Sequence, residues 1–535
     1  MKNPEKLANT DFLIIGAGAA GTAAAKCFAA AGLAARVSLF EQHSEPGGSA
    51  GYFSRGQPKR SHDAGATQLI ECKPGQLQRI LFDLAPAQGQ QEAERIFEKI
   101  PAIIQHWSGS NRKVSLRDDG RVEWMGADQP SEQEREEIAK LEKFLAACAN
   151  EAEWMWNLLA RIPRFPLQTL SDFLRAFSVF LRVPWNKKLI FPIVFILSCE
   201  QKMRMHGIRR KRIAWDVLSG LLIDTTQNSP GKSPWLAAAM GVSILRRGIF
   251  RCRAGMRSYF RPMIASFTQR GGQYFPNEKL TRIQSTNEGF RLTLVNQRNG
   301  AEQIIETSGQ VLLNQTIWDI VESLVPMDDT IRKTRVFRRW VKTSKSESGW
   351  GAFALYATVE DNPKWPDSPF FHQIFASGDT PDELQSSLYV SIPGRDDPAN
   401  PVGHRILTAT IHVNAASALT EDSRGLWTSL LVQRIENNLG CKLSNIESAT
   451  PKTFERYISR RQGRVGGFPL RFSNFMFFAN PSQLNHPSQK NCRLLLMGDT
   501  VFPGQGVVAC SVSGIVAFER ATGLRFTDLI KTMPR

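Results

Sequence analysis

The sequence predicts an α/β fold, α+β overall, because three observations combine along its 535 residues. Near the N-terminus, an apolar run ends in glycine and is followed by a stretch of small, helix-forming residues. Near the C-terminus, a second apolar run ends in a Gly-Asp turn and is followed by another small-residue helix. The interior instead carries a long amphipathic pattern and several alternating strands. We therefore expect one half built on a parallel sheet and another half with a mixed sheet and a helical part.

The first element is a strand–turn–helix unit. Residues 12–15 form an apolar run typical of a buried strand, and residues 22–31 form the helix. The turn between them has the pattern G-x-G-x-x-G, made by Gly16, Gly18, Ala19, Ala20 and Gly21. In such a turn the first glycine makes the tight bend, the second lets a diphosphate approach the backbone, and the third lets the helix lie close to the sheet. The N-terminus of the helix then faces negative charge.

An acidic residue stands in register with this turn. A second apolar strand, residues 36–40, ends at Glu41, about twenty residues beyond Gly21. There a carboxylate can accept hydrogen bonds from a ribose. Since the turn follows a strand, opens a helix and has its acid in place, a bound dinucleotide is favoured over a glycine-rich turn without a ligand.

A glycine pair follows the acid. Gly47 and Gly48 precede Ser49, and a further glycine, Gly65, ends the segment Ser61-His62-Asp63-Ala64-Gly65. With the first turn, this arrangement resembles the flavoprotein family of amine oxidases, phytoene desaturases and carotenoid isomerases.

The resemblance implies an FAD-binding domain of the Rossmann-like, glutathione-reductase type, with Gly48, Ser49 and Gly65 beside the FAD. The family usually has Arg in the place of Ser49. A cation for the pyrophosphate would then come from elsewhere in the chain, such as Arg55 or Lys59.

The C-terminal element supports the same cofactor. Residues 494–497 are a buried strand that ends at Gly498-Asp499, where an Asp can accept hydrogen bonds from the ribityl hydroxyls of a flavin. The helix that begins near Gly506 and Val507 would point its positive end at negative charge on the isoalloxazine. The pattern G-D-x-x-F-P-G-Q-G resembles the carotenoid desaturase and isomerase branch more closely than amine oxidases.

The middle of the chain adds weaker similarities. By resemblance, Leu280 meets the adenine through its backbone, and Asn314 turns back towards the cofactor from a strand end. Residues 222–227 resemble a helix of the carotenoid C-3',4' desaturase group. A hairpin is expected around Asn299-Gly300, between residues 290–295 and 303–305.

These segments divide the chain into two discontinuous domains. We expect an FAD-binding domain from residues 1–75, 251–319 and 486–535, and a substrate- and membrane-binding domain from residues 76–250 and 320–485. The strands expected in the mixed sheet of the second domain are residues 351–359, 388–393 and 405–413.

The helical part of the second domain suggests membrane contact. Residues 131–162 predict one long amphipathic helix. Residues 167–183 are apolar and aromatic, and the apolar run 189–199 lies between two basic clusters, with Trp185 at its edge. A core helix with a solvated basic flank would have the same pattern. The basic composition and the resemblance favour a monotopic insertion through about residues 167–212.

Composition narrows the partners and the compartment. The formal net charge of +17 favours anionic surfaces, but no helix-turn-helix, finger or RNP-like motif indicates nucleic acid. The eight cysteines are scattered without C-x-x-C pairs, so neither a metal site nor a disulfide framework is expected. The N-terminus lacks an apolar signal core and no apolar run reaches about eighteen residues. We therefore expect a cytoplasmic location, peripheral on the inner face of a membrane.

The resemblance also implies a reaction. It implies an FAD-dependent oxidoreductase, most directly a carotenoid desaturase, in which a hydride passes from an allylic carbon of a long conjugated lipid to flavin N5 and a proton is then lost. Two alternatives stay open: an isomerase or saturase of a polyene, and an inactive, membrane-attached flavoprotein. The sequence assigns no catalytic residue. Glu200, Asp216 and Asp224 are acids in the lipid-facing half, but such acids are more often solvated or paired.

Overall fold

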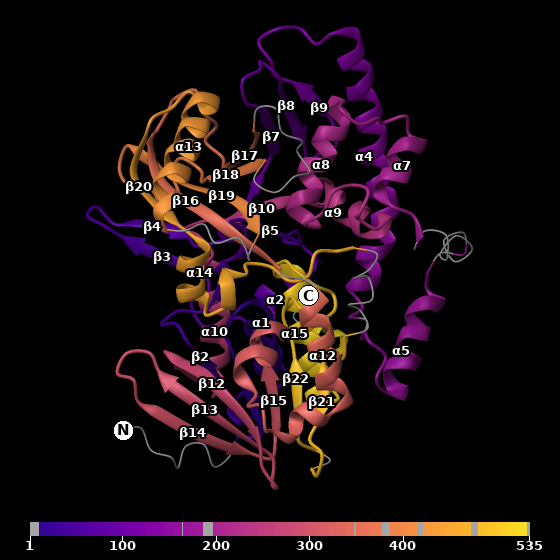
Figure 1. The fold of residues 1–535 in the computed structure, drawn as a ribbon, viewed down its shortest axis with the longest axis vertical. Helices are drawn as coiled ribbons and strands as arrows, with labels where there is room; N and C mark the ends of the chain where they lie inside the picture. The colour runs from indigo at the N-terminus through magenta and orange to yellow at the C-terminus, as the bar shows by residue number, and fades with distance from the viewer. Residues whose placement is uncertain are drawn as a thin grey trace.

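The structure is a computed structural model. It describes residues 10–162, 164–183, 185, 196–346, 349–376, 386–414, 421–471, 480–489 and 491–531. Figure 1 shows a lower part around one sheet and an upper part in which a second sheet lies beside a group of helices.

The lower part is organised around a six-stranded sheet. From edge to edge its strands are β11 (Gln273–Pro276), β2 (Val37–Glu41), β1 (Phe12–Ile15), β15 (Gln310–Leu313), β22 (Arg493–Leu496) and β21 (Gln483–Asn485). All neighbouring pairs are parallel except β21 with β22. Because parallel strands end at the same edge, segments far apart in the sequence meet where β1, β15 and β22 end. This confirms the predicted parallel sheet.

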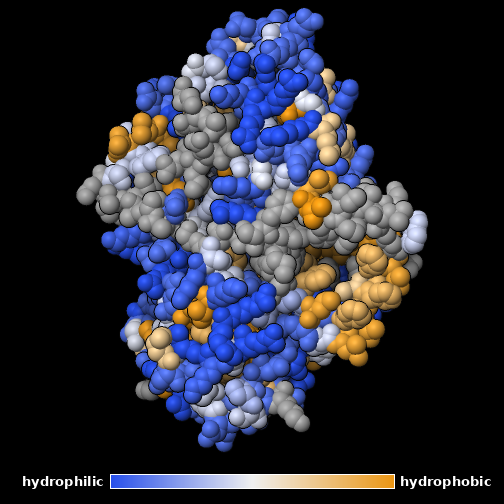
Figure 2. Space-filling model, turned by 45° about the vertical axis from the view of Figure 1, so that its right-hand side comes forward, coloured by the Kyte–Doolittle hydropathy of each residue, from blue (hydrophilic) through white to orange (hydrophobic). Residues whose placement is uncertain are grey.

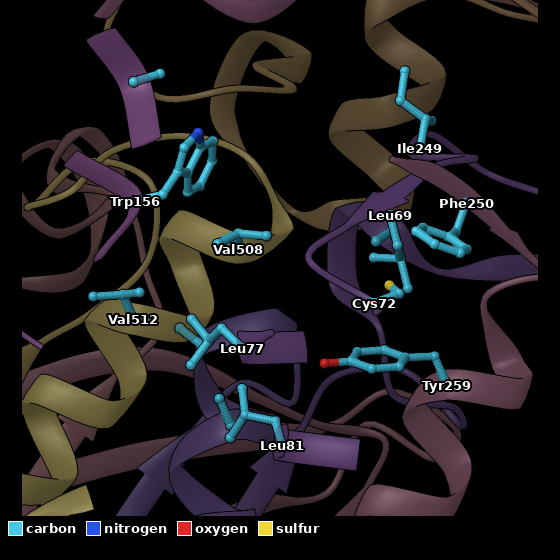
Figure 3. Packing of buried hydrophobic residues seen from close by; sticks show 14 of the residues in the cluster. Leu69, Cys72, Leu77, Leu81, Trp156, Ile249, Phe250, Tyr259, Val508 and Val512 are labelled. Atoms are coloured by element: carbon cyan, nitrogen blue, oxygen red, sulfur yellow. The ribbon is translucent and has the colours of Figure 1, made fainter. Parts of the chain in front are cut away.

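Both faces of this sheet are covered, as a parallel strand that is apolar along its whole length requires. Phe12 and Ile14 face a core shared with α1 (Ala19–Ala30), α2 (Leu77–Asp83), α10 (Arg257–Gln269) and α15 (Val507–Thr522). Leu13 and Ile15 face the opposite core, built on the antiparallel strands β12 (Glu278–Ser285), β13 (Phe290–Asn296) and β14 (Glu302–Thr307). Figure 3 shows the first core, where α15 packs near Leu77 and Tyr259. The hairpin predicted around residues 299–300 is thus present.

The upper part contains an eight-stranded mixed sheet. From edge to edge its strands are β20 (Leu443–Ala449), β16 (Trp350–Glu360), β19 (His404–Asn414), β18 (Ser387–Ile392), β17 (Phe370–Phe375), β7 (Ala102–Trp107), β8 (Lys113–Arg117) and β9 (Val122–Trp124). Only β17 and β7 pair in parallel. Helix α13 (Glu421–Leu439) covers one face through Leu431 and Ile435. The predicted mixed sheet and its three expected strands are therefore confirmed.

Helices form the rest of the upper part. The predicted amphipathic helix is α4 (Glu132–Leu159), which begins at a capping box between Ser131 and Glu134. It packs with α7 (Cys199–Met205), α8 (Ile213–Thr225) and α9 (Trp235–Arg247), while α5 (Leu170–Leu181) lies apart on the right of Figure 1. Among the described residues, no helix combines the length and apolar character needed to cross a bilayer.

Shorter elements complete the fold. Strands β3 (Tyr52–Arg55) and β4 (Arg60–Asp63) form a two-stranded hairpin. A three-stranded sheet has the order β5 (Leu69–Ile70), β10 (Ile249–Cys252) and β6 (Phe97–Ile100). The remaining helices and turns are η2 (Ala34–Arg36), η3 (Gly48–Ala50), α3 (Ala93–Ile96), α11 (Ile317–Asp319), η4 (Ile320–Leu324), η5 (Thr330–Lys333), α12 (Arg335–Ser346), α14 (Pro451–Ile458), η6 (Arg461–Gly463) and α16 (Phe526–Lys531). The two-domain boundaries given above stay a prediction.

Candidate cofactor and substrate cavity

One large cavity lies between the two parts. Its volume is about 1600 Å³, above the roughly 300–1,000 Å³ of a pocket for one small molecule. Its walls come from the N-terminal glycine turn, the start of α15, the mixed sheet, and helices α4, α5, α8 and α9. The cavity therefore has room for a dinucleotide and for a second molecule beside it.

Most of the predicted cofactor residues line this cavity. They are Gly16, Gly18, Ala19, Glu41, Gly48, Ser49, Gly65, Leu280, Asp499, Gly506 and Val507. The other three do not line it: Ala20 and Gly21 lie in the first turn of α1, and Gly498 lies two residues after β22. The fold thus brings five separate segments to one place, and the contact of each residue with FAD stays a prediction.

The glycines are required by close approach of the backbone. A Cβ atom on Gly21 would stand 1.9 Å from the carbonyl oxygen of Gly16, so the helix could not pack on its own turn. A Cβ on Gly18 would stand 2.8 Å from Nδ2 of Asn314, and one on Gly48 would stand 3.2 Å from Cα of Gly18. The two glycine segments therefore form one narrow backbone cradle, as a diphosphate site needs.

Glu41 is held rigidly at the end of β2. Its side chain is buried, and its two carboxylate oxygens accept hydrogen bonds from the backbone N–H groups of Ala17 (2.6 Å) and His43 (2.9 Å). Burial raises the pKa of Glu41 to about 7, while the backbone hydrogen bonds act in the opposite direction. The carboxylate is thus oriented on the cavity wall, with lone pairs left for a ribose.

Two helix N-termini open onto the cavity. Helix α1 begins after Gly18 and α15 begins after Gly506, which has a φ of +93°. Neither helix has a side-chain cap or an acidic residue in its first turn. Their first N–H groups and the positive ends of both dipoles are therefore available to negative charge on a ligand.

Buried polar atoms on the wall fit FAD. Within the described part of the chain, Ser49 Oγ, Gln227 Oε1 and Gln505 Oε1 are buried without a hydrogen-bond partner. All three residues line the cavity. A buried polar atom left unpaired costs about 1–3 kcal/mol, so these atoms suit a ligand that carries O–H or N–H donors. The hydroxyls and ring N–H of FAD are donors of this kind.

The cations near the cavity differ from those expected. Arg55 and Lys59 lie in and beside the exposed β3–β4 hairpin and do not line the cavity. Instead, Arg460 lies on the wall and its Nη1 donates a hydrogen bond to Oδ2 of Asp499 at 2.6 Å. Nothing in the local sequence around Arg460 marks it as a site residue, because only the fold brings it to Asp499.

The part of the cavity away from the glycine cradle is apolar and aromatic. It is lined by Trp154, Met155, Trp156, Leu236, Met240 and Phe371, and by Phe173, Phe177 and Phe180 from α5. Asp224, at the end of α8, also lines it and has an exposed side chain. Burial raises the pKa of Asp224 to about 6.

Asp224 lies close to the start of α15. The neighbouring Thr225 carbonyl accepts a hydrogen bond from Nε2 of Gln505 at 3.5 Å, and Gln505 immediately precedes Gly506. This contact joins the acidic end of α8 to the predicted flavin end of the cavity. Of the three acids considered from the sequence, Asp224 is therefore the one on the cavity wall, whereas Glu200 pairs with Arg204 and Arg210.

Helix α5 carries one broad apolar face. Phe173, Phe177 and Phe180 line the cavity and are also exposed, and Leu170, Leu174 and Leu181 are exposed beside them, as is Trp185 just beyond the helix. Figure 2 shows hydrophobic side chains gathered on the flank of the molecule where α5 lies. The apolar wall of the cavity thus continues along α5 into an apolar surface.

Comparisons with known proteins agree with this architecture. Residues 14–84 match the family model of an NAD(P)-binding Rossmann-like domain. A chloroplastic prolycopene isomerase from Daucus carota is 24% identical over 538 residues, covering 95% of this chain and 79% of the relative.

Solved structures share the whole fold. A redesigned putrescine oxidase covers 96% of this chain and 98% of its own, with a TM-score of 0.57 and 13% identity. A fatty acid isomerase from P. acnes covers 96% and 99%, with a TM-score of 0.55 and 12% identity. These two likenesses concern the fold. The Rossmann-like match and the prolycopene isomerase relative agree with the FAD-dependent enzyme that the sequence predicts, and the chain is similar to carotenoid-type isomerases in sequence and to amine oxidases in fold.

Proposed function

We propose that this enzyme desaturates a long, apolar polyene that it takes from a membrane. One observation carries the proposal: a single cavity joins the glycine cradle and the start of α15 to an aromatic chamber bordered by α5, a helix whose apolar side chains line the chamber and are exposed. A conjugated hydrocarbon chain fits such a chamber because it offers no polar groups that would need partners.

Membrane contact through α5 is part of this proposal. Exposed large apolar side chains gather on α5 and next to it, and basic residues such as Arg204 and Arg210 follow along the chain with exposed side chains. Apolar groups can enter the headgroup boundary while cations meet anionic lipid. Residues 186–195, within the predicted membrane-contact segment 167–212, lie outside the described residues. The cytoplasmic, inner-face location belongs to the same proposal.

The chemistry needs one hydride acceptor and one proton acceptor. FAD, when bound, supplies the hydride acceptor. We assign the proton acceptor to Asp224, which lines the apolar chamber and lies near the start of α15. A hydride leaves one allylic carbon, a proton leaves the neighbouring carbon for Asp224, and a new C=C bond forms from the remaining electron pair. The dry wall keeps water from the charge that develops on the substrate.

Isomerisation of a polyene is the second candidate. It is favoured by the prolycopene isomerase relatives, whose likeness extends over 95% of this chain in the carrot protein. An acid with a pKa of about 6 can also donate a proton to a double bond, after which rotation and proton loss change its geometry. This route needs no net transfer of electrons.

Co-expression with pathways that make different polyenes tests the proposal. Pigments would be extracted and separated by chromatography, with a Gly18→Val variant as the control that blocks the cofactor cradle. A red-shifted absorption shows added double bonds and supports desaturation. An altered isomer ratio at unchanged mass supports isomerisation, and a blue shift shows saturation. Unchanged polyenes with every pathway, from a protein that carries reducible FAD, would contradict a polyene substrate.

A further inference from the structure

We propose that Arg460 supplies the positive charge that holds the diphosphate of FAD, by direct contact, while its hydrogen bond to Asp499 fixes its position. The inference concerns the cofactor and does not depend on the identity of the substrate. It follows from the small number of cations on the cavity wall and from one chain of close contacts.

The glycine cradle has no cation of its own. A diphosphate carries negative charge that backbone N–H groups and a helix dipole offset only in part. Next to the cradle, the side chain after the glycine pair is the neutral Ser49, whose buried Oγ lacks a hydrogen-bond partner among the described residues. An anion in the cradle therefore needs a charged group from another segment.

Among the described residues on the cavity wall, three are permanent cations: Lys279, Arg460 and Arg461. Lys279 precedes Leu280 on β12, at the predicted adenine end. The Arg461 side chain is 53% exposed and pairs with Glu322 at 3.3 Å, whereas the Arg460 side chain is only 18% exposed. Arg460 is thus better shielded from solvent than Arg461, and it is the cation that contacts Asp499.

Close contacts connect the cradle to Arg460. A Cβ on Gly18 would stand 2.8 Å from Nδ2 of Asn314, and a Cβ on Gly498 would stand 2.9 Å from Oδ1 of the same side chain. Asp499 follows Gly498 and accepts the hydrogen bond from Arg460. The guanidinium therefore lies on the same wall as the cradle, beyond the side chains of Asn314 and Asp499.

The neighbouring helix fixes the segment that carries Arg460. Tyr457, in the last turn of α14, donates a hydrogen bond from its hydroxyl to the carbonyl of Tyr52 at 3.1 Å. Its ring centroid lies 4.5 Å from that of His43. These contacts tie α14 to the segment that contains Gly47 and Gly48, so Arg460 keeps its place relative to the cradle.

The chemistry of the guanidinium suits a bridge between two anions. Its five N–H donors lie in one plane, and the bond to Asp499 uses Nη1. The other edge can donate to phosphate oxygens in the fork geometry that favours Arg at phosphate sites. Asp499 would otherwise place an unbalanced carboxylate beside the diphosphate, so the same residue orients the site and removes a repulsion.

Titration of the full-length, FAD-depleted protein with FAD tests the inference, with flavin fluorescence as the readout. We expect Arg460→Met to raise the Kd for FAD about 10- to 100-fold, the effect of losing a charge-assisted hydrogen bond. Arg456→Met, an exposed residue of α14 outside the cavity wall, is the matched control and should leave the Kd unchanged. Thermal unfolding of the FAD-depleted variants checks that they fold.

A second substitution distinguishes direct contact from simple neutralisation of Asp499. If Arg460 contacts the diphosphate, Ser49→Arg added to Arg460→Met should restore at least part of the lost affinity, because it returns a cation to the cradle. An unchanged Kd in Arg460→Met would overturn the inference. So would a loss that Asp499→Asn repairs and Ser49→Arg does not.

Discussion

Glu519 Oε2 accepts a hydrogen bond from Nε of Arg164 at 2.9 Å, which ties the C-terminal part of α15 to the segment before α5. The same oxygen lies 2.9 Å from Nη1 of Arg175, within α5. Glu519 is fully buried, and Asp172 and Arg520 form a second buried pair beside it at 3.1 Å. Helix α15 thus opens onto the cavity at one end and anchors α5 at the other.

The first prediction concerns this buried network. Glu519→Gln removes the charge between two mostly buried guanidinium groups, so we expect the free energy of unfolding to fall by about 3–5 kcal/mol. Chemical denaturation measures this change, with one m-value fitted to all variants. Asp528→Asn, which breaks an exposed pair with Lys531 within the neighbouring α16, is the control and should leave the free energy of unfolding nearly unchanged. Equal losses in both variants would show that the network adds no stability.

The second prediction concerns the exposed leucines of α5, apart from its cavity-lining phenylalanines. Leu170, Leu174 and Leu181 are exposed and do not line the cavity. Replacing all three with Gln should weaken binding to anionic liposomes at least tenfold, since each buried leucine contributes about 1.5–3 kcal/mol. FAD content should stay unchanged. Ile304→Gln, at an exposed apolar site on β14, is the control. Liposome sedimentation that is the same for all proteins would refute membrane contact through α5.

The third prediction concerns the pH dependence of Asp224. If Asp224 accepts the proton, turnover requires the carboxylate and should rise with pH through about 6. If it donates a proton, as in isomerisation, turnover should fall over the same interval. Asp224→Asn should be inactive in either case while still binding FAD. A pH profile through 6 that is identical in the variant and the parent would exclude both roles.

The same carboxyl affects stability in a defined direction. Its pKa is raised in the folded protein, so its protonated form is favoured and its contribution is fully present below the unfolded pKa of about 4. That contribution is lost as pH rises through about 6. As the pH rises from about 4 to about 6, the melting temperature of the parent should therefore fall relative to that of Asp224→Asn. Parallel melting curves across this interval would contradict the raised pKa.

The fourth prediction compares two glycines of one turn. Gly21→Ala places Cβ 1.9 Å from a backbone oxygen that cannot move away, so we expect little soluble protein. Gly18→Ala meets only the side chain of Asn314, which can rotate but then enters the diphosphate cradle. This variant should fold and lose FAD affinity, and Asn314→Ala should restore part of it. Soluble yield and the ratio of flavin to protein absorbance measure the two effects.

The sequence was sufficient where structure is encoded locally. The strands that end at Gly16, Glu41, Asn314 and Gly498 could be recognised from short apolar runs with glycine or polar ends, and their convergence follows from parallel pairing. The long α4 followed from its apolar spacing and its N-terminal acids. The common feature is that neighbours in the sequence determine each of these elements.

The rest depends on contacts between distant segments. Arg460 reaches Asp499 across 39 positions of sequence, and Arg164 reaches Glu519 across 355. No periodicity marks such pairs. Arg55 and Lys59 are close to the glycine pair in sequence, yet the β3–β4 hairpin carries them outward. Asp224 could be named from the sequence as an acid of the right region, but its place on the cavity wall required the fold.

The apolar face that α5 shares between cavity and surface also bears on how the enzyme should be measured. A hydrocarbon that enters past this helix would come from the lipid phase, where its supply is set by its mole fraction in the leaflet and by lateral diffusion. Diluting the vesicles with buffer would leave that supply unchanged, whereas adding empty lipid would lower it. Turnover of this enzyme would therefore saturate with the mole fraction of substrate in the membrane, and not with its bulk concentration.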